Sequence, residues 1–146
     1  MLQAHAEARV LVVDDHEDNV LLLRRLLTRY GLTDVHTVTD PREVADHLPE
    51  LSPDLVLLDL YMPYIDGFSL LHEIRRWAAG TYLPVIVLTA DTSPETLRRA
   101  LDAGATDFLT KPFNATEIVI RVRNLLQTRG LYRTLSEHGL ATKISG

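Results

Sequence analysis

The segment "VLVVDDHEDN" at residues 10–19 joins an apolar run directly to two adjacent carboxylates. Residues 10–13 form an apolar block without polar alternation, which is typical of a strand buried on both faces of a parallel sheet. Asp14 and Asp15 follow at once. Neighbouring carboxylates repel each other and are costly to remove from water, so their position at the end of a buried strand predicts a function for them.

The rest of the chain repeats this alternation of short apolar runs and longer amphipathic stretches. The predicted strands are residues 9–13, 34–38, 54–58, 84–88 and 106–110, and the predicted helices are residues 17–30, 41–48, 67–78, 94–103 and 115–128. Strands that alternate with helices pair in parallel through crossovers, and the helices cover both faces of the sheet. We therefore expect an α/β fold with a doubly wound, five-stranded parallel sheet.

Composition narrows the class of protein. The 146 residues include no cysteine, which excludes disulfides and thiolate metal ligands. The formal net charge is −5 and basic residues are scattered, so we expect no direct contact with nucleic acid. No apolar run approaches the length of about 20 residues that crosses a bilayer, and the first ten residues lack a signal-peptide pattern. The sequence therefore predicts a cytoplasmic domain that binds no membrane.

Polar side chains end four of the five predicted strands. Asp14 and Asp15 follow the first strand, Asp59 follows the third, Thr89 the fourth and Lys111 the fifth. Ligands of open parallel sheets bind outside the carboxyl ends of the strands. We therefore expect these five side chains to meet in one pocket.

This set of residues is typical of phosphoryl chemistry with a divalent cation. Three clustered carboxylates repel each other unless a hard cation lies among them, and Mg²⁺ prefers such oxygen ligands. One carboxylate can then act as a nucleophile toward phosphorus, and Asp59 is the best placed of the three. Lys111 supplies a cation and Thr89 a hydroxyl donor for phosphoryl oxygens.

Each residue also has a purely structural interpretation. Asp14 can cap the following helix, Thr89 can be an ordinary β-branched strand residue, and Lys111 can be a solvated surface lysine. The combination favours the metal interpretation, because independent structural roles would not place all of these residues at strand ends.

The sequence resembles the receiver domain of two-component response regulators, the CheY-like superfamily, from residue 8 to about residue 128. The resemblance is carried by "VDD" at 13–15, "LLDLYMPYIDG" at 57–67, "LTA" at 88–90 and "DFLTKPF" at 107–113. It implies a flavodoxin-like (βα)5 fold with strand order 2-1-3-4-5.

The resemblance also assigns roles at the pocket. It implies Asp59 as the phosphorylation site and Asp14 and Asp15 as the acidic metal pair, with Asp15 the direct ligand. Asp59 and the backbone carbonyl of Tyr61 are implied as further ligands of Mg²⁺, or of Mn²⁺ in its place. Thr89 and Lys111 are implied as contacts of the phosphoryl group.

A conformational switch is implied as well. Phe108 matches the aromatic position that turns inward when Thr89 engages phosphate, although a phenylalanine there is also a common core residue. Pro112 matches a cis-proline that directs Lys111 into the pocket. The implied readout surface comprises the fourth helix, fifth strand and fifth helix, and a homodimer through that surface is left open.

The implied reaction is transfer of a phosphoryl group from a sensor histidine kinase or a phosphotransfer protein to Asp59. The domain would catalyse only its own phosphorylation and dephosphorylation, so we expect a signalling domain and not an enzyme that turns over external substrates. Tyr61 and Asp91 match positions that tune dephosphorylation, and we predict that both border the path of the attacking water.

Two other functions compete with this one. A pseudo-receiver would serve only as an interaction module, against which the complete set of pocket residues argues. A phosphatase with an aspartyl nucleophile carries a second acid two residues after the nucleophile. This chain has Tyr61 at that position, which argues against turnover of external substrates.

The sequence predicts an N-terminal extension at residues 1–8, a receiver domain at 9–128 and a linker or tail at 129–146. Leu131, Tyr132 and Leu135 permit a helix beyond Gly130, and the two glycines of this segment leave its extent open. The segment resembles linkers that lead into output modules, so we expect a C-terminal output domain in a longer protein.

Other polar residues show less pattern. The six histidines lack metal-ligand spacing, and we expect His16 to be a surface or packing residue despite its position after the acidic pair. The arginine pairs at 24–25, 75–76 and 98–99 are expected on solvated helix faces, where they form no common cationic groove.

Overall fold

A computed structural model of the chain describes residues 1–137. The strands are β1 (Arg9–Val13), β2 (Asp34–Val38), β3 (Leu55–Asp59), β4 (Val85–Thr89) and β5 (Asp107–Thr110). The helices are α1 (Glu17–Arg29), α2 (Val44–Leu51), α3 (Gly67–Trp77), α4 (Pro94–Asp102) and α5 (Ala115–Glu137), with 3₁₀ turns η1 (Gln3–His5) and η2 (Pro41–Glu43).

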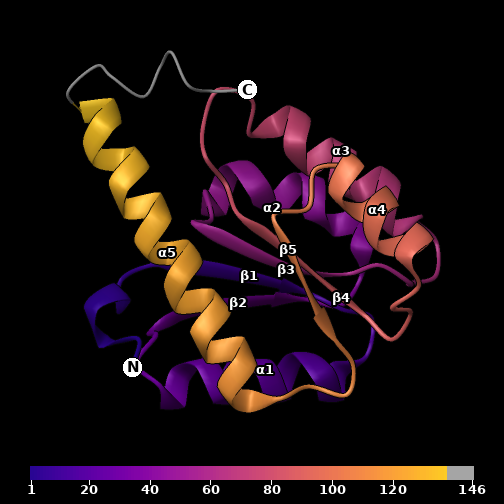
Figure 1. The fold of residues 1–146 in the computed structure, drawn as a ribbon, viewed down its shortest axis with the longest axis horizontal. Coiled ribbons are helices and arrows are strands. Elements are labelled where there is room, and N and C mark those ends of the chain that lie inside the picture. Colours follow the sequence, from indigo (N-terminus) through magenta and orange to yellow (C-terminus); the bar gives the residue numbers. More distant parts are fainter. Residues whose placement is uncertain (138–146) are drawn as a thin grey trace.

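The five strands form one parallel sheet in the order β2-β1-β3-β4-β5. Helices α1 and α5 cover one face, and α2, α3 and α4 cover the other (Figure 1). The predicted fold class and strand order are therefore confirmed. The strands β1, β3 and β4 have a neighbour on each side and helices above and below, which explains their continuous apolar runs.

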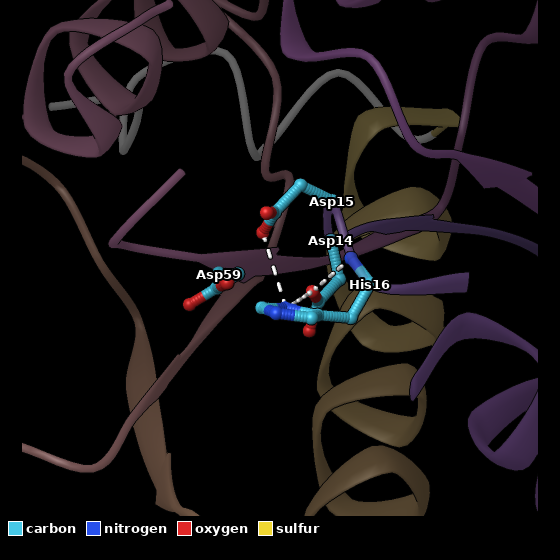
Figure 2. Close-up of side chains that lie close together, drawn as sticks. All are labelled: Asp14, Asp15, His16 and Asp59. Atoms are coloured by element: carbon cyan, nitrogen blue, oxygen red, sulfur yellow. Dashed lines mark hydrogen bonds and ion pairs between the residues drawn. The ribbon is translucent and has the colours of Figure 1, made fainter. Parts of the chain in front are cut away.

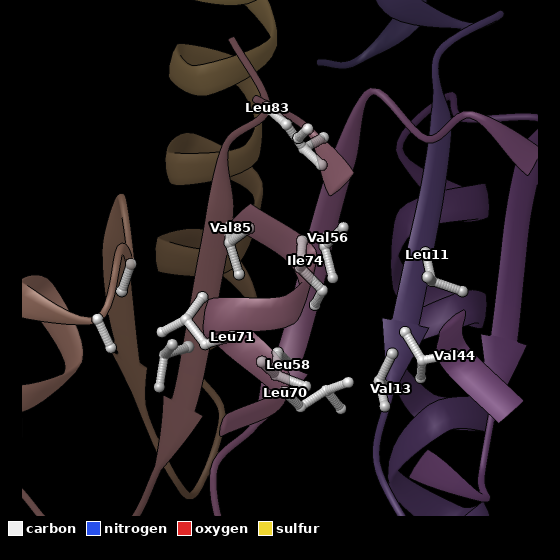
Figure 3. Close-up of a cluster of buried hydrophobic side chains, with 14 of the residues drawn as sticks. Leu11, Val13, Val44, Val56, Leu58, Leu70, Leu71, Ile74, Leu83 and Val85 are labelled. Carbon is white, nitrogen blue, oxygen red and sulfur yellow. The ribbon is translucent and has the colours of Figure 1, made fainter. Parts of the chain in front are cut away.

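Two apolar layers hold the helices to the sheet. Side chains that alternate along a strand point to opposite faces, so Leu11 and Val13 join one layer while Val10 and Val12 join the other. Figure 3 shows the first layer, in which Leu71 of α3 packs against the strands. The sheet is thus fixed from both sides, and the ends of its strands are held in a constant arrangement.

The second predicted helix differs from the structure. Residues 41–48 were expected to be one helix, but a 3₁₀ turn occupies residues 41–43 and α2 runs from Val44 to Leu51. The carboxylate of Asp40 accepts the backbone N–H of Arg42 at 3.0 Å, which tightens the chain into a turn before the helix begins. Pro49 lies inside α2 and does not end it.

The N-terminal residues pack against the domain. The side chain of Leu2 is fully buried, and its backbone N–H donates to the carbonyl of Tyr30 at 2.7 Å. Gly31 has φ +124°, and a Cβ at this position would lie 2.8 Å from the backbone nitrogen of Gln3. The close approach of the two segments therefore requires glycine at residue 31.

Helix α5 is longer than residues 115–128, the range that we predicted. It continues through Gly130 to Glu137, so the part of the tail at residues 129–137 is helical; residues 138–146 of that segment lie outside the described residues. Contacts with the domain compensate for the weak helix propensity of glycine: Arg129 and Arg133 both reach Asp54.

One arginine of the predicted solvated pairs is placed differently. Arg75 is half-buried and donates hydrogen bonds to the carbonyls of Leu83 and Gly104 and to the hydroxyl of Thr106. Its long side chain spans from α3 to the starts of β4 and β5. The expectation of a solvated face is therefore wrong for Arg75.

Within residues 1–137, no helix combines the length and the apolar composition that crossing a membrane requires.

Candidate functional site

The predicted pocket residues lie at the carboxyl ends of adjacent strands. Asp14 and Asp15 follow β1, Asp59 ends β3 and Thr89 ends β4, and these three strands are neighbours. Lys111 follows β5 at the edge. Asp14, Asp59 and Thr89 are the buried polar residues of the described chain. The sheet topology therefore gathers residues that are almost a hundred positions apart in sequence.

The acidic side chains form one cluster. Asp14, Asp15, His16 and Asp59 each offer a ligand atom, and these atoms all lie within 4.8 Å of one another (Figure 2). The ammonium of Lys111 lies 3.2 Å from Oδ2 of Asp14 and 3.3 Å from Oδ2 of Asp59. Lys111 thus pairs with two of the three carboxylates, and negative charge remains in excess.

This excess is visible at Asp59. Burial raises the pKa of the Asp59 carboxyl, and the neighbouring charge of Asp14 raises it further. The ammonium of Lys111 and the backbone N–H of Tyr61, which donates to Oδ1 of Asp59 at 3.3 Å, lower this pKa but do not reverse its direction. An additional cation in the cluster would therefore stabilise the ionised form of Asp59.

The residues fit a divalent metal ion. Oδ1 of Asp15 is buried and has no hydrogen-bond partner among residues 1–137. The imidazole of His16 lies 3.4 Å from this oxygen without hydrogen-bond geometry. A buried carboxylate oxygen without a donor is costly, and a hard cation satisfies it. The donor set consists mainly of carboxylate oxygens, which is the set that Mg²⁺ and Mn²⁺ prefer.

The loop after β3 passes close to the cluster because of Gly67. A Cβ at this residue would lie only 2.1 Å from the carbonyl oxygen of Leu60, so no other side chain fits there. Asp66 begins α3 by accepting the backbone N–H of Phe68 at 3.3 Å. The loop therefore returns tightly over the end of β3 and holds the backbone of Tyr61 beside Asp59.

The loop after β4 organises Thr89 and Asp91. The hydroxyl oxygen of Thr89 accepts the backbone N–H of Asp91 at 3.0 Å. The carboxylate of Asp91 accepts the hydroxyl of Thr96 at 2.6 Å, the N–H of Ser93 at 2.9 Å and the hydroxyl of Tyr61 at 3.3 Å. These bonds, the one from Thr96 above all, lower the pKa of Asp91 to about 2.

The remaining predicted residues lie on and after β5. Phe108 is half-buried and packs against the apolar layer between the sheet and helices α2, α3 and α4. The peptide bond between Lys111 and Pro112 is cis, the conformation that the resemblance implies. The backbone N–H of Lys111 donates to the carbonyl of Thr89 at 3.0 Å, so the two residues are also joined through the main chain.

Comparison with known proteins agrees with this arrangement. The profile of the response regulator receiver domain matches residues 10–123. The chain belongs to this family. It is thus the receiver domain of a two-component response regulator, which is a signalling domain.

The receiver domain is similar to longer regulators. It is 41% identical over 133 residues to the transcriptional regulatory protein PrrA of Mycobacterium leprae, covering 91% of this chain and 56% of PrrA. It is 38% identical over 141 residues to the sensory/regulatory protein RpfC of Xanthomonas campestris, covering 94% of this chain and 19% of RpfC. The chain therefore spans less than two thirds of each of these relatives.

Solved structures show the same fold as the receiver domain. The chemotaxis protein CheY4 of Vibrio cholerae superposes with a TM-score of 0.76 at 30% identity, covering 82% of this chain and 99% of CheY4. NtrX of Brucella abortus gives a TM-score of 0.81 at 32% identity, covering 90% of this chain and 29% of NtrX.

Two residues of the receiver domain's pocket were missed in the sequence. His16 is exposed, as expected, but in addition its backbone N–H donates to Oδ1 of Asp14 at 3.0 Å and its ring lies 3.4 Å from a carboxylate oxygen of both Asp14 and Asp15. The amide of Asn19 donates to Oδ2 of Asp14 at 3.1 Å. Asn19 lies in the first turn of α1, five residues after Asp14, and this spacing after the doublet was the available signal.

Proposed function

We propose that Asp59 is the phosphoacceptor of this receiver domain and that Asp14 and Asp15 hold the metal ion on which its phosphorylation depends. The observation that carries the proposal is the pairing of Lys111 with both Asp14 and Asp59 inside a cluster that still has an excess of carboxylates. Such a site attracts a dication first and then a phosphoryl group.

Asp14, Asp15, Asp59 and the backbone carbonyl of Tyr61 would hold Mg²⁺, and Mn²⁺ can take its place. When bound, the ion neutralises the carboxylates and the charge of a phosphoryl group in transit. The chain's own residues position the reacting oxygen. The N–H of Tyr61 fixes Oδ1 of Asp59, and Lys111 lies at Oδ2.

In the proposed reaction a carboxylate oxygen of Asp59 attacks the phosphorus of a phosphohistidine on a sensor histidine kinase or phosphotransfer protein. An oxygen–phosphorus bond forms, the phosphorus–nitrogen bond breaks, and its electron pair remains on the imidazole that leaves. The ammonium of Lys111 binds one phosphoryl oxygen and the hydroxyl of Thr89 binds another. The acyl phosphate is later hydrolysed by water.

The switch follows from the present partner of Thr89. The hydroxyl of Thr89 donates to the carbonyl of Asp91 at 3.4 Å, so donating to a phosphoryl oxygen instead requires this bond to break and the loop after β4 to rearrange. Phe108 lies on β5, next to β4, the strand that precedes this loop. When the loop rearranges, the Phe108 side chain moves with it and changes the surface of α4, β5 and α5. We propose that this surface controls an output domain of a longer protein, or a homodimer, in the cytoplasm.

Acetyl phosphate tests the proposal without a partner kinase. The purified chain is incubated with Mg²⁺ and acetyl phosphate and analysed by intact mass. We expect a phosphoryl adduct that requires Mg²⁺ and that Asp59→Asn abolishes, while Asp91→Asn retains it. An adduct that persists in Asp59→Asn contradicts the proposal. The absence of any adduct favours a pseudo-receiver, and sustained turnover of phosphate esters favours a phosphatase.

A further inference from the structure

A cavity of about 540 Å³ lies at the amino-terminal ends of β4 and β5. Asp59 lies at the opposite, carboxyl-terminal end of the sheet. It is bordered by the end of α3, the segments before β4 and β5, and the last turns of α5. Leu83, which lines it, lies far along the buried cluster from Leu58, the neighbour of Asp59 (Figure 3). Small-molecule sites commonly have volumes of about 300–1,000 Å³. The cavity is therefore separate from the acidic pocket and large enough for a small ligand.

The charge of the cavity is unusual for this chain. Three arginines and no acidic residue line it within residues 1–137, although the chain has 20 acidic and only 15 basic residues. Arg75 comes from α3, and Arg129 and Arg133 come from α5. Elements far apart in sequence thus bring three guanidinium groups to one hollow.

The charge of Arg75 is not neutralised. Its nitrogens donate to the carbonyls of Gly104 and Leu83 and to the hydroxyl of Thr106, which are all uncharged acceptors. Burial lowers the pKa of the Arg75 guanidinium, and no carboxylate among the described residues opposes this effect. Only part of its five N–H donors is used. A half-buried cation of this kind is stabilised by an anion in the cavity.

Arg129 and Arg133 share one carboxylate. Oδ1 of Asp54 lies 2.9 Å from Nε of Arg129 and 3.2 Å from a terminal nitrogen of Arg133. Asp54 can neutralise only one of them. The three arginines and Asp54 together carry a net charge of +2. This charge suits a ligand with a phosphate group better than a ligand with a single carboxylate.

The cavity also has an aromatic wall. The rings of Tyr82 and Tyr132 stack with their centroids 4.4 Å apart and their planes inclined by 7°. Ala78 and Leu83 add apolar surface beside them. A flat aromatic surface next to guanidinium groups suits a ligand with an organic part, such as a base, attached to phosphate.

We propose that this cavity binds a phosphorylated small molecule with at least two negative charges. Arg75, Arg129 and Arg133 hold its phosphate oxygens, because the planar guanidinium matches phosphate geometry. Tyr132 and the two α5 arginines belong to the part of α5 that extends beyond the sheet (Figure 1). A bound ligand therefore ties this extension to α3 and to the start of β4.

Calorimetry with pyrophosphate and with ADP tests the proposal. The titrations are done in EDTA, since the acidic pocket repels both anions when no dication is present. We expect saturable binding of one probe molecule per chain, weakened about tenfold by Arg133→Ala, which removes one charge-assisted contact. Arg133 is exposed, so this variant should fold. Arg98→Ala removes the same charge from an exposed position on α4 and serves as the matched control.

Amide exchange gives an independent readout. Bound pyrophosphate should slow exchange at residues 129–136, where the ligand joins the helix to the domain. Tighter binding of ADP than of pyrophosphate supports a nucleotide, and equal affinity supports recognition of phosphates alone. No saturable binding of either probe, or equal weakening by Arg133→Ala and Arg98→Ala, would overturn the proposal.

Discussion

The hydroxyl of Tyr61 donates a hydrogen bond of 3.3 Å to Oδ2 of Asp91 and so joins the loop after β3 to the loop after β4. Tyr61 is two residues after Asp59, and Asp91 is two residues after Thr89. The Tyr61 side chain is 55% exposed, so its ring lies at the solvent side of the pocket. The bond thus connects the two positions that we expect to govern access of water to a phosphorylated Asp59.

Substitutions at this bond should change the lifetime of the phosphorylated domain. Tyr61→Asn removes the ring and the bond, and we predict hydrolysis about tenfold faster, equivalent to ~1.4 kcal/mol of barrier. Asp91→Ala frees the ring and should accelerate hydrolysis less, while Tyr61→Phe keeps the ring and should have the smallest effect. The decay of the adduct is followed by intact mass after removal of acetyl phosphate. Decay at the wild-type rate in both Tyr61→Asn and Asp91→Ala contradicts this prediction.

The pKa of Asp91 should depend more on Thr96 than on Tyr61. Its value of about 2 lies below the ordinary 3.8 chiefly because of the hydrogen bond from Thr96. A lowered pKa contributes stability that is present above about pH 4 and is lost as the pH falls through about 2. We predict that Thr96→Val raises the pKa of Asp91 toward 3.8 and that Tyr61→Phe raises it less. Carboxyl NMR titration measures both, and the reverse order refutes the ranking.

Removal of the charge of Asp59 should stabilise the metal-free domain. Burial and the charge of Asp14 raise its pKa, so the ionised carboxylate opposes folding at neutral pH. We predict that Asp59→Asn in EDTA increases the free energy of unfolding, because the variant has no charge to desolvate and none for Asp14 to repel. Urea denaturation measures this change. Addition of Mg²⁺ should stabilise the wild type more than the variant; an equal effect on both argues against a metal at this carboxylate.

The extension of α5 should depend on Asp54. Asp54→Ala leaves Arg129 and Arg133 without their shared carboxylate, and we expect faster amide exchange at residues 129–137 and, in the sheet, only at Arg9, whose N–H Asp54 accepts at 2.8 Å. Asp102→Ala, which removes an exposed acid at the end of α4, is the matched control. Unchanged exchange in Asp54→Ala shows that the stacking of Tyr82 and Tyr132 is sufficient to hold the helix.

The fold could be predicted because the signals were local and repeated. Each buried strand is a short apolar run followed by a helical pattern, and the polar residues at the strand ends marked the edge where they meet. Asp14 shows where a local signal misleads: it does not cap α1, whose N-cap is His16 without a side-chain cap bond, but accepts the backbone N–H of His16 and lies in the acidic cluster.

The errors at residues 129–137 and at Arg75 came from contacts between distant segments. The periodicity of residues 129–137 is weak, and their helix is held by Asp54 and Tyr82, which lie 47 or more positions earlier. Arg75 carries no local signal that distinguishes it from its exposed neighbour Arg76, because its acceptors are backbone carbonyls of other segments. Pairings of this kind depend on tertiary structure and leave no pattern in the sequence.

The central claim is that Asp59, among three clustered carboxylates, accepts the phosphoryl group. Reduction with borohydride converts an aspartyl phosphate to homoserine, and peptide mass spectrometry then identifies the residue. After treatment with Mg²⁺ and acetyl phosphate we predict homoserine at residue 59 and aspartate at residues 14 and 15. Homoserine at residue 14 or 15, with residue 59 unmodified, would contradict the account.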